Sequence, residues 1–308
     1  NIVKKITKLG IDLPKPVLLP TILLPNDNGA LVATTDSTPI IRRLENDFSE
    51  RKIIPDDPAL AFINYLLEDF GDEWVTKYMF HYRWYFEEDA DVAGAILPLV
   101  DIAINTSNDT LTEYKKIVTE RQKGRLWVVG SNDRTADFID SSYKRFLNLM
   151  EDHLLNSPFL LGTKPSSSDF SFYGQLTQLV GFDPTPRKIA YEYSLRTVAW
   201  VDVLDDLSGH DAENTSWTKL EDSPESLKNM LKEVGKMYIP ALLANSEALI
   251  KGDETWEMKI DNAVWKQKTF PYQAKCLKWI KNEFDLLNQE DKKRVLNFLD
   301  DTGCETIL

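Results

Sequence analysis

The densest cluster of aromatic and basic side chains in the sequence comprises Met79, Phe80, His81, Tyr82, Arg83 and Trp84. Such a mixture is typical of ligand pockets, whose walls are mostly apolar with a few polar groups. It also suits a packed helix, because Tyr78 and Tyr82 extend an apolar stripe at helical spacing. In that alternative, Arg83 would form an ion pair with Glu87 one turn later. We favour the packing interpretation for this cluster.

The other residues with catalytic or metal-binding chemistry are isolated. The three histidines lie far apart in the sequence, at His81, His153 and His210. A metal site would need scattered ligands, so we predict none. Cys276 stands between Lys275 and Lys278, which could lower the pKa of its thiol, but its apolar neighbours favour a buried structural cysteine. The sequence contains no glycine-rich phosphate loop, no Gly-x-Ser-x-Gly elbow and no His-Glu-x-x-His pair.

The first fifty residues predict a β-hairpin followed by a helix. The strands are expected over Val17–Leu24, which contains Pro20, and over Ala30–Thr34, with a turn at residues 26–29 between them. Asp36 and Ser37 can cap a helix that runs to about Phe48. Residues 2–9 resemble the end of a short helix. Taken singly, Pro20 is typical of an edge strand, and the acid and serine of a helix cap.

The rest of the chain predicts a mostly helical domain after a linker at residues 55–58. Apolar residues at helical spacing predict one long helix over residues 58–86. Further helices are expected over residues 143–154, 170–180, 186–207, 224–251, 271–287 and 289–300. Alternation between Trp256 and Lys268 predicts a second small β-hairpin that turns at Asp261 and Asn262.

Composition excludes several classes of partner. The chain has 308 residues, 43% of them hydrophobic, and a formal net charge of -13. This charge repels phosphate backbones and anionic lipids, so we predict no nucleic-acid partner. The longest mostly apolar stretch, Ala93–Ile104, is too short to span a bilayer. Two cysteines favour a reducing compartment, the cytoplasm. The start at Asn1 suggests a processed or truncated chain and keeps an organelle such as the mitochondrion open.

Two groups of residues resemble glutathione S-transferases. Leu19 and Pro20 before a strand, with Asp36 and Ser37 at the next helix start, resemble the second half of that family's thioredoxin-like domain. Gly162, Pro165, Ser166 and Asp169 resemble the capping box of its helical domain, which serves folding. The resemblance implies a mainly α protein with a partial α/β unit over residues 1–54 and an extended helical domain over 55–308. It is similar to a larger, less characterised group of the family.

The resemblance also implies a function and a site. In the family the proline follows a cis bond, and Leu19 would pair its backbone with the cysteinyl part of glutathione. Ser37 would bind the γ-glutamyl carboxylate and Asp36 the ammonium group. An apolar electrophile would lie near the end of the first long helix, with His81, Tyr82, Arg83, Trp84 and Tyr173 as candidate pocket residues. The catalytic residue is expected upstream of Asn1.

Two functional classes stay open at the level of sequence. The chain is expected to bind glutathione as a co-substrate and to conjugate it to an electrophile, or to use the transferase fold as a non-catalytic scaffold. The family also implies a homodimer, and the scaffold alternative implies a subunit of a larger assembly.

Overall fold

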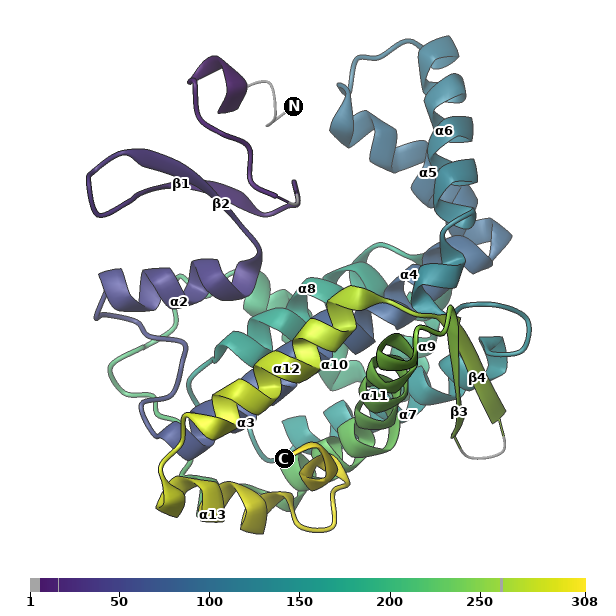
Figure 1. Cartoon of the computed structure of the whole chain (residues 1–308). Helices are drawn as coiled ribbons and strands as arrows, with labels where there is room; N and C mark the ends of the chain where they lie inside the picture. Colours follow the sequence, from purple (N-terminus) through teal and green to yellow (C-terminus); the bar gives the residue numbers. More distant parts are fainter. Residues whose placement is uncertain (1–5, 16, 261–262) are drawn as a thin grey trace. The chain divides into compact units, whose positions relative to one another are not determined.

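In the computed structural model, which describes residues 6–15, 17–260 and 263–308, the chain divides into two compact units between Ile53 and Ile54. This division lies one residue before the predicted domain boundary. Helices dominate the structure, and the strands of the described residues form two antiparallel hairpins (Figure 1). The prediction of a mainly α protein with a small β part is therefore confirmed.

The first unit contains a helical turn at residues 6–8, the hairpin β1 (Thr21–Pro25) and β2 (Leu31–Thr35), and α2 (Ser37–Asp47). Thr21 pairs with Thr35, and Pro25 with Leu31. The first strand thus begins after Pro20 rather than at Val17. Proline has no N–H group to donate to a strand ladder, which explains why the pairing starts at Thr21. Half of the predicted helix over residues 2–9 lies outside the described residues, and its described half contains the helical turn at residues 6–8.

The predicted helix over residues 58–86 is three segments in line. α3 (Pro58–Phe70) is followed by a π-helical turn, η1 (Gly71–Val75), and by α4 (Thr76–Tyr85). Asp57 starts this series because its carboxylate accepts hydrogen bonds from the backbone N–H groups of Ala59 and Leu60. Phe86 is extended, with φ -84° and ψ 133°, and ends α4.

Two helices of the second unit, which spans residues 54–308, were not predicted from the sequence. α5 (Glu87–Asp101) contains Pro98, and α6 (Asn108–Lys123) packs beside it. A short 3-10 helix, η2 (Leu126–Val129), leads to α7 (Ala136–Leu154). α5 escapes a pattern search because a proline and an early run of acids interrupt its apolar face.

The remaining helices follow the predicted order with one division. α8 spans Ser167–Gly181, and the predicted helix over residues 186–207 is two helices, α9 (Pro184–Tyr193) and α10 (Leu195–Asp205). Ser194 separates them because its backbone is not helical (φ -156°, ψ 88°) and its side chain caps α10. After η3 (Leu220–Asp222), the long helix α11 spans Glu225–Lys251.

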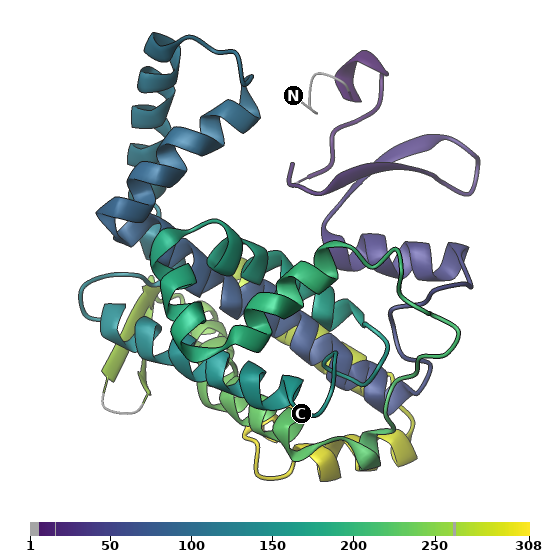
Figure 2. The ribbon, with the colours of Figure 1, turned by 180° about the vertical axis from the view of Figure 1, so that it is seen from behind.

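The last part of the chain contains the second hairpin and two further helices, which pack on the helical bundle. β3 (Thr255–Ile260) and β4 (Ala263–Lys268) form the second hairpin, whose predicted turn at residues 261–262 lies outside the described residues. α12 (Pro271–Asp285) packs on α3 and α11, and α13 (Gln289–Leu299) and η4 (Cys304–Ile307) follow. Figure 2 shows the bundle from behind.

The core of the second unit is a group of aromatic rings contributed by α3, α7, α8 and α11. Phe70 lies 6.3 Å from Phe146, 6.0 Å from Phe172 and 6.0 Å from Tyr238, measured between ring centroids. Tilted and edge-to-face pairs at such distances stabilise a core beyond the area that they bury. Among the described residues, no helix is long and apolar enough to cross a membrane.

Candidate functional site

The segment before β1 is held against the end of β2 by two threonines. The Thr35 hydroxyl oxygen lies 3.0 Å from the carbonyl oxygen of Leu18 and 3.2 Å from that of Pro20. The Thr21 hydroxyl also donates to the Leu18 carbonyl. Because Thr35 directly precedes Asp36, these bonds place the Leu19–Pro20 segment next to the start of α2. The sequence did not predict this role of Thr35, although facing threonines are a recognised cross-strand pair.

The start of α2 has an unusual backbone. Asp36 has φ 81° and ψ 129°, in a region that residues with a side chain rarely adopt. Such a conformation costs about 1 to 3 kcal/mol and is concentrated at functional sites. Its carboxylate accepts a hydrogen bond from the Thr38 N–H at 3.3 Å. The N-terminal turn of a helix also presents backbone N–H groups and a positive dipole, which together favour an anion.

The peptide bond between Leu19 and Pro20 is cis, the geometry expected from the resemblance. The Leu19 side chain is 78% exposed, and Pro20 is also exposed. Asp36 and Ser37 are half-buried. The first unit therefore brings together all four residues predicted to bind glutathione.

The side chains of the predicted pocket cluster at the end of α4 point in different directions around the helix. His81, Tyr82, Arg83 and Trp84 are all buried. The Tyr82 hydroxyl donates to Asp140 on α7 at 2.8 Å, whereas the Trp84 ring packs with Ala90 and Ala93 of α5. Successive residues on a helix point about 100° apart, so four in a row cannot face one cavity. These side chains pack the bundle, as the favoured interpretation predicted.

Arg83 does not pair with Glu87, so that part of the packing interpretation is wrong. Its guanidinium binds Asp183 with two nitrogens, at 2.8 and 2.9 Å, and donates to Gln178 at 2.8 Å. Glu87 accepts from Lys123 instead. The expected spacing fails because α4 ends at Tyr85, which places Arg83 and Glu87 on different helices.

His81 is a buried, neutral histidine. Its Nδ1 atom lies 2.7 Å from the Ser131 hydroxyl, its ring stacks on Tyr85 at 4.8 Å, and Nε2 has no partner among the described residues. Burial lowers the pKa of His81 to about 4, against an opposing effect of Asp140. This histidine therefore carries no charge at neutral pH.

Tyr173, the fifth pocket candidate, is half-buried on α8. Its hydroxyl donates to Asp205 at the end of α10. This contact joins two helices at the surface and does not involve the end of α4. The five candidate pocket residues are thus distributed over separate contacts of the second unit.

Ser166 and Asp169 form the capping box at the start of α8. The Asp169 carboxylate accepts from the backbone N–H of Ser166 and that of Leu160, both at 2.8 Å. Burial raises the pKa of Asp169 to about 6 in spite of these donors. Ser167 and Ser168 extend the contact to Asn64 of α3, so this motif docks α8 on the first helix of the unit.

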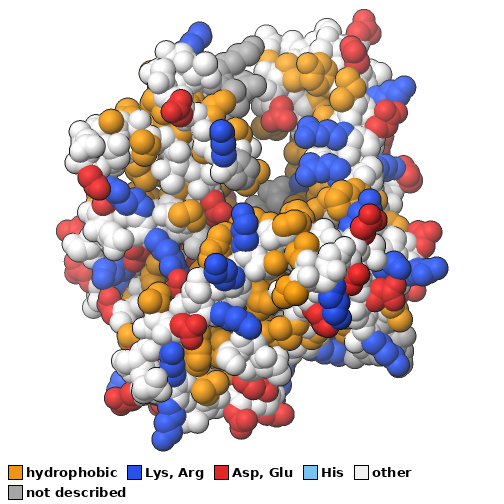
Figure 3. Space-filling model, viewed as in Figure 1, with side chains coloured by type: hydrophobic (Ala, Val, Ile, Leu, Met, Phe, Trp, Pro, Cys, Tyr) orange, Lys and Arg blue, Asp and Glu red, His pale blue; other side chains and the backbone are white. Residues whose placement is uncertain are grey.

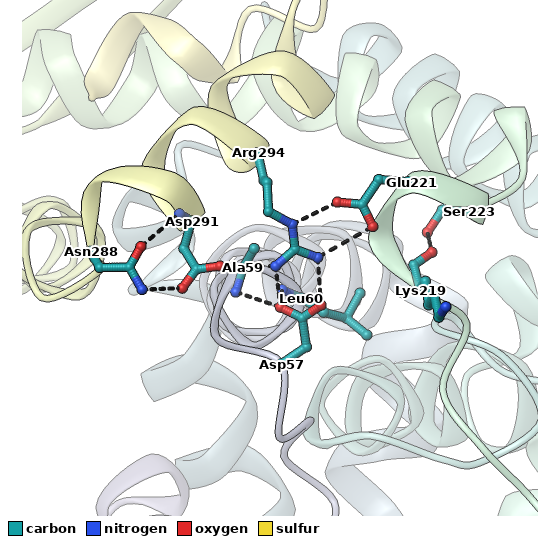
Figure 4. A network of polar contacts seen from close by, with 9 residues as sticks. All are labelled: Asp57, Ala59, Leu60, Lys219, Glu221, Ser223, Asn288, Asp291 and Arg294. Carbon is teal, nitrogen blue, oxygen red and sulfur yellow. Dashed lines mark hydrogen bonds and ion pairs between the residues drawn. The ribbon is translucent and has the colours of Figure 1, made fainter.

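Arg294 is the centre of a second polar network, which was not predicted from the sequence (Figure 4). From α13 it binds Asp57 at 2.6 and 2.9 Å, Glu221 at 2.6 Å and Asp291 at 2.8 Å. The guanidinium holds the pKa values of Asp57 and Glu221 below their usual range. The carboxylates that bind Arg294 already take part in helix caps and ion pairs. This network therefore holds segments of the fold together.

No group of three or more His, Cys, Asp and Glu side chains in the described part of the chain is placed to hold a metal ion. Both cysteines are buried, and burial raises the pKa of Cys304 to about 12. A thiol with so high a pKa is a poor nucleophile.

Comparison of the chain with protein-family models, with curated proteins and with solved structures found no match. The function is therefore inferred from the geometry of the residues.

Proposed function

We propose that this chain binds glutathione through its first unit and belongs to a transferase-like protein that conjugates glutathione to an apolar electrophile. The observation that carries the proposal is the pair of contacts from Thr35 to Leu18 and Pro20. They bring an exposed segment to the start of a helix, where an acid and a serine follow one another.

Glutathione has three features that match these groups. Its γ-glutamyl carboxylate suits the N–H groups and the Ser37 hydroxyl at the start of α2. Its ammonium group suits the Asp36 carboxylate, since a charged hydrogen bond is stronger than a neutral one. Its cysteinyl backbone suits the main chain of Leu19, in the manner of an added strand. The proposal assigns no residue of the chain to the activation of the thiol.

The experiment is a calorimetric titration of the chain with glutathione, compared with the double variant Asp36→Ala/Ser37→Ala. We expect saturable binding by the parent chain and an affinity about a hundredfold lower in the double variant, because two contacts to a charged ligand are lost. Loss of the helix cap alone would cost only about 0.5 to 2 kcal/mol of stability and leave the folded variant able to bind.

Asp27→Ala is the matched control, because Asp27 is an exposed acid at the turn end of the same hairpin. It should bind glutathione as the parent does. If the double variant melts earlier but keeps the parent affinity, Asp36 and Ser37 only cap the helix, and the proposed site is wrong.

A non-catalytic scaffold is the second candidate, and the burial of His81, Tyr82, Arg83 and Trp84 favours it. These side chains stabilise the helical unit and are not available to an electrophile. A parent chain that shows no saturable heat with glutathione would support this candidate against the first.

A further inference from the structure

α12 has two chemically different faces. Its buried face consists of Gln273, Cys276, Leu277, Ile280 and Phe284, which pack toward α3 and α11. Its opposite face exposes Lys275, Lys278, Trp279 and Lys281, which we call the lysine face. The three lysines follow one another at i, i+3 and i+6, and therefore form an inclined row along the helix. Figure 3 shows basic side chains over α12 in this view.

The lysine face is not neutralised by the protein itself. The lysine-rich stretch of residues 266–294 also contains acids, and the sequence alone suggests that the charges alternate over one solvated surface. In the structure Asp285, one turn after Lys281 on α12, faces Lys292 at 3.7 Å, and Asp291 of α13 binds Arg294 at 2.8 Å. Among the described residues, Lys275, Lys278 and Lys281 form no ion pair. This row of unpaired positive charge stands on a protein of net charge -13.

An aromatic side chain accompanies the lysines. Trp279 is 39% exposed, and its ring meets the ring of Tyr272 edge-to-face, with the centroids 5.9 Å apart. Lys275 lies between these two aromatic residues in the sequence, three positions from one and four from the other. Exposed tryptophan is typical of the anchoring residues of protein interfaces.

We propose that the lysine face binds an acidic segment of a partner protein, with Trp279 receiving an apolar side chain of that segment. The lysine face and such a segment are complementary in charge, because carboxylates at helical spacing on the segment would lie opposite the row of lysines. The negative net charge of the chain selects against long polyanions. A duplex or an anionic bilayer extends beyond one helix face and meets the surrounding acids, whereas a short acidic segment does not. The lysine face belongs to the second unit, whereas the residues proposed to bind glutathione belong to the first.

The test uses a fluorescein-labelled helical peptide in which glutamates repeat at i, i+4 and i+7 beside leucines, with fluorescence anisotropy at low ionic strength. We expect the parent chain to bind it and the variant Lys275→Glu/Lys278→Glu/Lys281→Glu to bind about tenfold more weakly or worse. The variant Lys275→Arg/Lys278→Arg/Lys281→Arg should retain binding. Trp279→Ala should weaken it.

The matched control is Lys116→Glu/Lys188→Glu/Lys219→Glu, which changes the net charge equally at exposed positions elsewhere. It should bind nearly as the parent does. Equal affinity of the two triple variants would overturn the proposal, as would a parent chain that does not bind the peptide. The proposal would also be overturned if single-stranded RNA or phosphatidylserine vesicles bound through the three lysines while the peptide did not.

Discussion

At the scale of single residues, His81 shows how the surroundings of a side chain decide its chemistry. An imidazole next to tyrosines and an arginine could act as an acid or a base if water and substrate reached it. In this protein it is enclosed, with Ser131 on Nδ1 and aromatic rings around it. A buried cation costs more free energy than a buried neutral ring, so the charged form is disfavoured.

This burial predicts a dependence of stability on pH. The pKa of His81 is about 4 in the folded protein and about 6.5 in an unfolded chain, so the unfolded state binds the proton first as the pH falls. The stability contributed by neutral His81 is complete above pH 6.5 and is lost as the pH falls toward about 4. Between pH 7 and about pH 4.5 the loss should be about 2 to 3 kcal/mol.

Urea unfolding of the parent and of His81→Gln at these two pH values measures this loss. The variant should be less stable at pH 7, yet its free energy of unfolding should fall less on acidification. Comparing the two chains cancels the contributions of the carboxylates and of His153, whose pKa is also lowered by burial. An identical fall in both chains would show that His81 titrates normally.

At the scale of elements, the π-helical turn between α3 and α4 begins at Gly71, and α8 packs closely against this turn. The Ser171 hydroxyl of α8 donates to the Glu68 carbonyl at 2.6 Å, immediately before this turn. A methyl group on Gly71 would lie 2.1 Å from the Ser171 Oγ atom and 2.8 Å from the Phe172 ring. The close approach of α8 to the turn therefore requires a residue without a side chain.

Gly71→Ala should lower the free energy of unfolding by about 1 to 3 kcal/mol, because the added methyl group forces the two helices apart. Gly174→Ala is its control within α8, since no atom lies within 4 Å of the position of the added carbon. That variant should be neutral or more stable by up to about 1 kcal/mol, because alanine favours a helix. Thermal melts of both variants make the comparison, and equal melting temperatures would contradict the packing described for Gly71.

At the scale of the second unit as a whole, Arg294 links three parts of the chain that are distant in sequence. It joins α13 to the cap of α3 through Asp57 and to η3 through Glu221 (Figure 4). Asp57 accepts from the first N–H groups of α3 at the same time. One side chain thus links α13 to the start of α3 and to η3.

Arg294→Ala should destabilise the chain by about 1 to 2 kcal/mol, a modest value because the network is partly exposed to solvent. Lys293→Ala removes one positive charge from an exposed position of the same helix and should change stability by less than about 0.5 kcal/mol.

The effect of Arg294→Ala should also depend on pH. The guanidinium lowers the pKa of Asp57 and of Glu221, so its contribution is present above their ordinary values near 4 and is lost as the pH falls below them. The difference between parent and variant, measured by chemical unfolding at pH 7 and about pH 3, should therefore shrink in acid. A difference that stays constant would show that packing of the arginine stem, not charge, provides the stabilisation.

The sequence by itself determined the parts of this protein whose causes lie within a few residues. Capping side chains, apolar periodicity and turn residues predicted most helices, both hairpins and the box at Ser166 and Asp169, since a helix forms its hydrogen bonds with its own neighbours. It did not predict the π turn, the break at Ser194 or the α5–α6 pair, where the local preference is weak and tertiary contacts decide.

The tertiary structure alone decided which residues meet. Arg83 binds Asp183 a hundred positions away rather than its neighbour Glu87, and the acids near the lysines of α12 turn to other partners. Thr35 reaches Leu18 and Pro20 only because the hairpin brings its two ends together. Contacts over such separations depend on how whole elements pack, because the spacing of two residues in the sequence sets no distance between them once the chain has folded.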